Sequence, residues 1–102
     1  MGTLFKKLQG FLWDTGNINK NWAKHRITNR EAEEIFFDKH YMILNDKLHS
    51  GKELRYNIIG LTENGKLLSV AFTIRHYLVR VISTRPAGKR ERNIYEKTSK
   101  IA

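Results

Sequence analysis

The sequence contains no cysteine, one proline and no long apolar segment. Without cysteine, the chain has neither disulfide bonds nor thiolate metal sites. The longest apolar run, residues 67–74, is too short to span a bilayer and contains Ser69 and Thr73. The first twelve residues include two lysines and a glutamine and lack a small-residue cleavage site, so we expect no secretory signal and a cytoplasmic location.

Acidic residues are also scarce. Ten Asp and Glu residues against nineteen Lys and Arg residues give a net charge of +9 and a pI of about 10.0. This balance favours an anionic partner, which can be nucleic acid, an acidic protein or an anionic membrane surface. The length of 102 residues is typical of one compact domain, which we expect at residues 11–102, after an extension formed by residues 1–10.

Three strand-like segments follow one another closely in the second half of the chain. Asn64-Gly65 separates the first from the second and predicts a hairpin with a type I′ turn. His76-Tyr77 forms a short corner before the third. Within the second segment, apolar residues alternate with small or polar ones, which predicts an antiparallel meander with one buried and one open face. The segments are residues 54–62, 66–75 and 78–84.

The same alternation selects the side chains of the open face. Arg55, Asn57, Thr73, Arg75 and Arg80 have the parity to share it. An arginine cluster on the open face of a sheet is therefore the candidate functional surface.

Helix signals occupy most of the remaining chain. Asp14 or Thr15 is expected to cap a first helix that ends near His25, and Thr28 with Glu31 forms a capping box for a second helix. Trp13, Trp22 and Tyr95 are expected in the core or in helix packing. The order predicts an α+β domain, with two N-terminal helices and a C-terminal helix packed on one face of an antiparallel sheet. The further bounds are strands 11–13 and 41–44, a second helix that stops near residue 38, an exposed loop 45–52 and a final helix 89–100.

Short patterns along the chain resemble those of a known family in their order and spacing. They are Phe11-Leu12-Trp13-Asp14, Asn21 with Lys24-His25, Glu31-Ala32-Glu33-Glu34 with Phe36-Phe37-Asp38, His49-Ser50-Gly51 with Glu53 and Arg55, Gly60 with Asn64-Gly65, Phe72-Thr73-Ile74-Arg75, Arg80-Val81-Ile82-Ser83, and Arg85, Ala87, Glu91 and Tyr95. Together these patterns resemble the BrnT family of bacterial toxins, which have a RelE-like ribonuclease fold. The chain departs from the family pattern at Gly16-Asn17, Arg26 and Pro86.

The resemblance implies the toxin of a type II toxin–antitoxin pair. Such a toxin is a metal-independent endoribonuclease without a cofactor, which cleaves RNA by attack of a 2′-OH on the phosphodiester and inhibits translation. The resemblance also implies an antitoxin similar to BrnA, with a ribbon-helix-helix part that contacts operator DNA. That antitoxin would cover the basic face.

This chemistry needs a base for the 2′-OH, an acid for the leaving oxygen, and cations for the phosphorane-like charge. Arg75 and Arg80 are the first candidates for the cations, because a guanidinium bonds two phosphate oxygens at once. Arg55 and Arg85 come second. Glu53 is the candidate base, with a surface ion pair as the alternative. His25 and His49 are the candidate acids, and His25 alternatively caps a helix C-terminus.

Other basic and aromatic residues are candidates for RNA binding. Lys24, His49, Arg85, Arg90 and Arg92 can contact phosphates, and a base can stack on Tyr77. A metal site is disfavoured, because the four histidines are dispersed. Two other classes of function stay open: a non-catalytic nucleic-acid-binding domain, and a protein-binding module whose arginines meet an acidic ligand.

Overall fold

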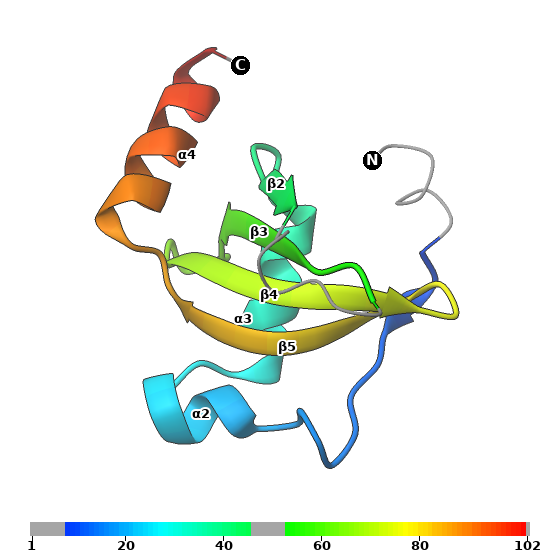
Figure 1. Ribbon diagram of the computed structural model, residues 1–102. Coiled ribbons are helices and arrows are strands. Elements are labelled where there is room, and N and C mark those ends of the chain that lie inside the picture. Colours follow the sequence, from blue (N-terminus) through cyan, green and yellow to red (C-terminus); the bar gives the residue numbers. More distant parts are fainter. Residues whose placement is uncertain (1–7, 46–52, 102) are drawn as a thin grey trace.

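A computed structural model of the protein, which describes residues 8–45 and 53–101, contains a five-stranded sheet (Figure 1). The strand order is β1-β5-β4-β3-β2, and all neighbours are antiparallel except β1, which is parallel to β5. The predicted meander is confirmed as the centre of this sheet. The strands are β1 (Gly10–Phe11), β2 (Met42–Asn45), β3 (Tyr56–Leu61), β4 (Leu67–Arg75) and β5 (Leu78–Pro86).

Two hairpins connect the three central strands. The first is confirmed at Asn64-Gly65, but the type I′ turn predicted there is wrong, because only Gly65 has a positive φ (84°). Three residues lie inside the Thr62 N to Lys66 O hydrogen bond of 2.8 Å, and Gly65 supplies the left-handed position of the loop. Two consecutive residues with positive φ occur instead in the second hairpin, where His76 (φ 51°) and Tyr77 (φ 63°) form the two-residue turn between β4 and β5.

The first helix is shorter than predicted. α2 comprises Lys20–His25, and the residues before it form turns. Asp14 is the reason: its side chain accepts a hydrogen bond from Gly16 N (2.8 Å), and its carbonyl accepts one from Ile18 N (2.8 Å). The carboxylate therefore caps a turn in place of the helix. The structure also corrects the expectation for Trp22, whose exposed fraction is 46%.

The second helix has the predicted capping box. α3 comprises Asn29–Glu34 and continues into the 3₁₀ helix η1, Ile35–Phe37, so the helical stretch stops at the predicted place. Thr28 Oγ1 accepts a hydrogen bond from Glu31 N (3.0 Å), and Glu31 Oε1 accepts one from Thr28 N (3.0 Å).

Helices cover both faces of the sheet, so the predicted one-face arrangement is wrong. Ala32 of α3 and Ile35 of η1 pack in one core cluster with Ile58, whereas Tyr95 of α4 (Lys89–Ile101) packs in another with Ile59. Adjacent residues of a strand point to opposite faces. The predicted burial of Tyr95 is confirmed, and its hydroxyl donates to Asp38 Oδ2 (2.6 Å).

The C-terminal helix covers only one end of its face. Glu91 of α4 accepts a hydrogen bond from Ser69, near the start of β4, whereas Arg75 ends the same strand (Figure 1). Within the described part of the chain, the face opposite α3 is therefore left without a helix at the Arg75 end.

The structure describes only part of the predicted N-terminal extension and only part of the predicted loop 45–52. Within the predicted extension, residues 1–7 are not described, Leu8 packs against the core and Gly10 begins β1. Within the predicted loop, residues 46–52 are not described. Over residues 8–45 and 53–101, none of the helices has the length and apolar character to cross a membrane.

The capping box gives a testable contribution to stability. Thr28→Ala removes the side-chain acceptor for Glu31 N, so we expect the free energy of unfolding to fall by about 1 kcal/mol. Thr28→Ser keeps the hydroxyl and should stay close to wild type. Urea denaturation followed by circular dichroism measures both, and an alanine variant as stable as the serine variant would contradict the capping role.

Candidate functional site

The arginines of the meander converge on a pocket at the end of the sheet face that α4 leaves uncovered. The register pairs Thr73 with Arg80, and the two-residue turn brings β5 back beside Arg75. Of the five side chains predicted to share the open face, Arg55, Thr73, Arg75 and Arg80 line this pocket, whereas Asn57, which pairs with Ala71, does not. Its volume of about 210 Å³ is several times that of a water molecule, which is enough for a phosphate group. The other lining residues are Gly16, Asn17, Lys20, Glu53, Val81 and Ile82.

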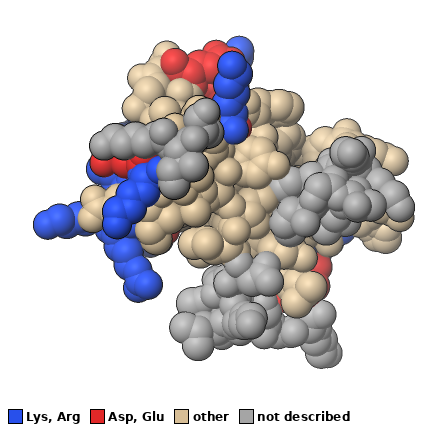
Figure 2. Space-filling model, turned by 90° about the horizontal axis from the view of Figure 1, so that it is seen from above, with Lys and Arg blue, Asp and Glu red and all other residues tan. Residues whose placement is uncertain are grey.

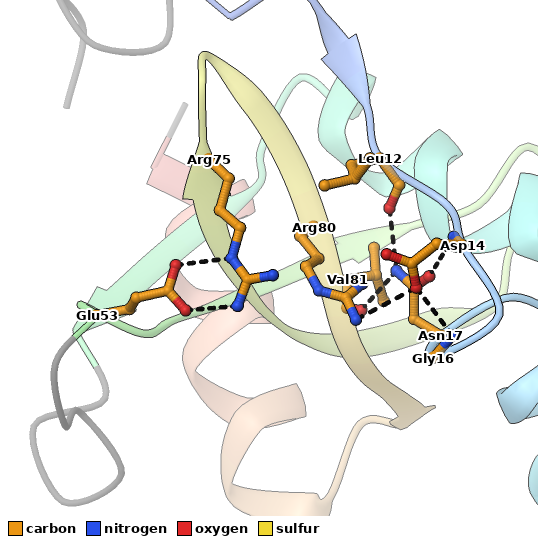
Figure 3. Close-up of polar contacts among 8 residues, drawn as sticks. All are labelled: Leu12, Asp14, Gly16, Asn17, Glu53, Arg75, Arg80 and Val81. Carbon is orange, nitrogen blue, oxygen red and sulfur yellow. Dashed lines mark hydrogen bonds and ion pairs between the residues drawn. The ribbon is translucent and has the colours of Figure 1, made fainter.

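Glu53 binds the Arg75 guanidinium side-on (Figure 3). Arg75 Nε donates to Glu53 Oε2 at 2.8 Å, and Nη2 donates to Oε1 at 2.6 Å. This hydrogen bonding lowers the pKa of the Glu53 carboxyl and raises the pKa of Arg75. Both side chains are more than 40% exposed. An exposed pair of this kind adds little stability and can exchange partners with an incoming anion.

Asp14 contacts the neighbouring guanidinium from the other side of the site (Figure 3). Arg80 Nη2 lies 3.3 Å from Asp14 Oδ1, and the Arg80 side chain is only 17% exposed. Arg80 Nη1 is buried and has no hydrogen-bond partner among the described residues. Such a donor costs roughly 1–3 kcal/mol of stability or more. Arg80 is therefore better fixed than Arg75, and it is kept in this position at a cost in stability.

A short loop, residues 12–18, holds Asp14 against the sheet. Asn17 is 3% exposed, and its Nδ2 donates to the carbonyl oxygens of Leu12 and Val81, each at 3.0 Å. Asn17 Oδ1 accepts a hydrogen bond from Asp14 N at 2.7 Å. The loop is thereby fastened to β5 one residue after Arg80.

Sequence reasoning missed four members of this site: Asp14, Gly16, Asn17 and Lys20. Asp14 was assigned only to a helix cap, although an Asp followed by Gly and Asn also favours a tight turn. Lys20 was not singled out. It begins α2 and lines the pocket from the side of the loop.

Several predicted site residues lie elsewhere. His25 ends α2 and, with Arg92, lines another pocket beside Leu68, which is roughly 23 Å along β4 from Arg75. His25 is therefore not among the described side chains that line the arginine pocket. Lys24 is exposed on α2, Tyr77 is 48% exposed at the tip of the β4–β5 hairpin, and His49 lies outside the described residues.

Arg85 shares the face of Arg75 and Arg80 but belongs to the opposite end of the sheet. Arg85 pairs with Ser69 on β4, whereas Arg80 pairs with Thr73 on the same strand. Ser69 and Thr73 are four residues apart, so Arg85 and Arg80 are separated by roughly 13 Å along the sheet. The Arg85 guanidinium donates to both Glu91 oxygens, at 2.6 and 2.9 Å, and so ties β5 to the first turn of α4. Arg90 and Arg92 are exposed on α4, and Lys and Arg side chains project together on that side of the molecule (Figure 2).

The described part of the chain contains no group of three His, Cys, Asp or Glu side chains that could hold a metal ion. A protein-family model described as a ribonuclease toxin, BrnT, of type II toxin–antitoxin systems matches residues 13–91. No curated protein matches the chain. The matched residues include the pocket and both of its carboxylates.

The pair between Arg75 and Glu53 predicts a measurable pKa coupling. Because hydrogen bonding from Arg75 favours the ionised carboxylate, Glu53 should titrate below the ordinary value of 4.5. In Arg75→Ala its pKa should rise toward that value. The charge-matched control Arg30→Ala should leave Glu53 unchanged. Carboxyl-carbon NMR titration measures each midpoint, and an identical Glu53 midpoint in wild type and Arg75→Ala would show that the pair does not form in solution.

Proposed function

The chain belongs to the BrnT family of ribonuclease toxins of type II toxin–antitoxin systems, and from this premise we propose how it acts. It is an endoribonuclease that cleaves RNA by attack of the 2′-OH on the adjacent phosphodiester, without a metal ion, and it thereby inhibits translation. The observation that carries the proposal is the convergence of Arg55, Arg75, Arg80 and Lys20 on one pocket.

The charge of the pocket suits an RNA phosphate. Four cationic side chains line it, and within residues 8–45 and 53–101 the carboxylates that oppose them are Glu53 and the adjacent Asp14. Preorganised cations stabilise the charge that develops on phosphate oxygens in the transition state. A guanidinium needs no metal to do so, and its planar fork fits two phosphate oxygens. This composition supports phosphate binding and metal-independent cleavage together.

Glu53 acts as the general base in this mechanism. A glutamate is ionised at neutral pH, so the Glu53 carboxylate can accept the 2′-OH proton. The 2′-oxygen then bonds to phosphorus and the bond from phosphorus to the 5′-oxygen breaks. The side-on pair uses Arg75 Nε and Nη2, so Nη1 can donate to a phosphate oxygen while the pair persists.

Lys20 replaces His25 as the candidate acid within the described residues. The leaving 5′-oxygen needs a proton, and an arginine does not release one in proteins. Lys20 lines the same pocket, and its ammonium group carries protons that can be transferred. The product ends are a 2′,3′-cyclic phosphate and a 5′-hydroxyl.

Membership of the family implies a cognate antitoxin as well as an RNA substrate. We assign to that antitoxin a BrnA-like architecture with a ribbon-helix-helix part, through which the complex reaches operator DNA. The basic residues of α4, including Arg90 and Arg92, offer an electrostatic surface either to this partner or to RNA beyond the cleaved bond (Figure 2). We expect both encounters in the cytoplasm.

Expression in a bacterium tests the proposed activity. Wild type should arrest growth and fragment total RNA, whereas Arg75→Ala/Arg80→Ala should do neither, because the phosphate loses both central cations. Arg30→Ala/Lys39→Ala removes the same charge from exposed positions outside the pocket and should remain toxic. Growth curves and RNA electrophoresis are the readouts.

The opposite results have distinct meanings. A wild type that leaves growth and RNA intact contradicts the proposal. A purified wild type that binds RNA with a steep salt dependence and never cleaves it favours the non-catalytic binding domain. Weak RNA binding that does not change with salt favours a protein-binding module.

A further inference from the structure

We propose that Asp14 is a positioning residue for Arg80 in the RNA-cleavage reaction. The inference rests on the proposed function and adds to it a residue that does not itself touch the substrate. Arg75 is held by the proposed base, Glu53, whereas Arg80 is held by a carboxylate from a loop that precedes α2. The carboxylates of Glu53 and Asp14 flank the two arginines from opposite sides (Figure 3).

The geometry gives Asp14 a fixed relation to Arg80. Asp14 Oδ1 lies 3.3 Å from Arg80 Nη2 and also accepts the hydrogen bond from Gly16 N, so this oxygen has a defined place. Asn17 anchors the loop to Leu12 and Val81. The anchor on Val81 directly follows Arg80 on β5. A rigid support of this kind holds a cation in its productive place, and a shift of about 1 Å can cost up to roughly 10²-fold in rate.

Gly16 supplies an independent observation that this contact is tight. A Cβ atom at Gly16 would lie 3.0 Å from Arg80 Nη2 and 3.1 Å from Asp14 Oδ1, and thus against both partners of the ion pair. Gly16 does not have a left-handed φ, so its backbone accepts alanine. A methyl group at this position would therefore press on the ends of the Arg80 and Asp14 side chains, which would have to move by a few tenths of an ångström.

A role in turn formation must be separated from a role in positioning. Asp14 forms the turn through its backbone carbonyl and through Oδ1, and asparagine retains an oxygen at that place. Asp14→Asn thus keeps the turn and the oxygen that faces Arg80, and it removes the negative charge of the ion pair. It also raises the net charge by one, so simple electrostatics predicts RNA binding that is unchanged or tighter. If Asp14 positions Arg80, turnover should be slower in this variant even though RNA binding is unchanged or tighter.

Steady-state cleavage of a fluorogenic RNA by purified protein tests the inference. For Asp14→Asn we expect kcat to fall about tenfold while KM changes by less than about twofold. Gly16→Ala should lower kcat as well, because it displaces the Arg80 guanidinium. Glu63→Gln makes the same charge change at an exposed hairpin position and should leave both constants unchanged. Thermal unfolding by circular dichroism checks that each variant is folded.

The outcomes separate this inference from the proposed function. If wild type does not cleave RNA, the proposed function fails and the inference fails with it. If wild type cleaves, Arg80→Ala is inactive and Asp14→Asn has the wild-type kcat, only the inference is overturned. If Asp14→Asn does not fold, Gly16→Ala decides, and a wild-type kcat in that folded variant overturns the inference.

Discussion

Repulsion between like charges is the constraint on which the site depends. Arg55, Arg75 and Arg80 converge on one pocket, and cations at short range repel one another unless anions compensate. Glu53 and Asp14 supply that compensation from opposite sides. The two ion pairs differ in exposure, because the Arg75–Glu53 pair is exposed, whereas the Arg80 side chain is mostly buried. In the proposed mechanism, the Arg75–Glu53 pair opens to an arriving phosphate, while Arg80 stays in place.

The part of the site that the sheet determines was predictable from the sequence. A strand has a side-chain period of two, so the alternation in the second segment was enough to assign Thr73 and Arg75 to one face. A two-residue corner then fixes the register of the next strand, which places Arg80 beside them. The capping box at Thr28 was equally predictable, because its signal is contained in four consecutive residues.

The remaining features depend on packing between distant segments. Nothing local shows that α4 covers the face opposite α3, or that α2 directs His25 away from the arginines and Lys20 toward them. The residue types at Asp14 are compatible with a tight turn and with the start of a helix. The contact of Asp14 with Arg80 on β5, 66 residues later in the chain, decides in favour of the turn. Arg85 has the expected parity, but its partner Glu91 comes from a helix whose position the strand pattern does not determine.

The chemical ends of the RNA fragments give the most direct test of cleavage by the 2′-OH without a metal ion. Purified wild-type protein is incubated with RNA in excess EDTA, and the fragment ends are identified by enzymatic end-labelling and mass spectrometry. We expect 2′,3′-cyclic phosphate and 5′-hydroxyl ends, because the 2′-oxygen displaces the 5′-oxygen. Fragments with 3′-hydroxyl and 5′-phosphate ends, or cleavage that stops in EDTA and returns with added Mg²⁺, would contradict the role of the arginine pocket as the source of the stabilising charge.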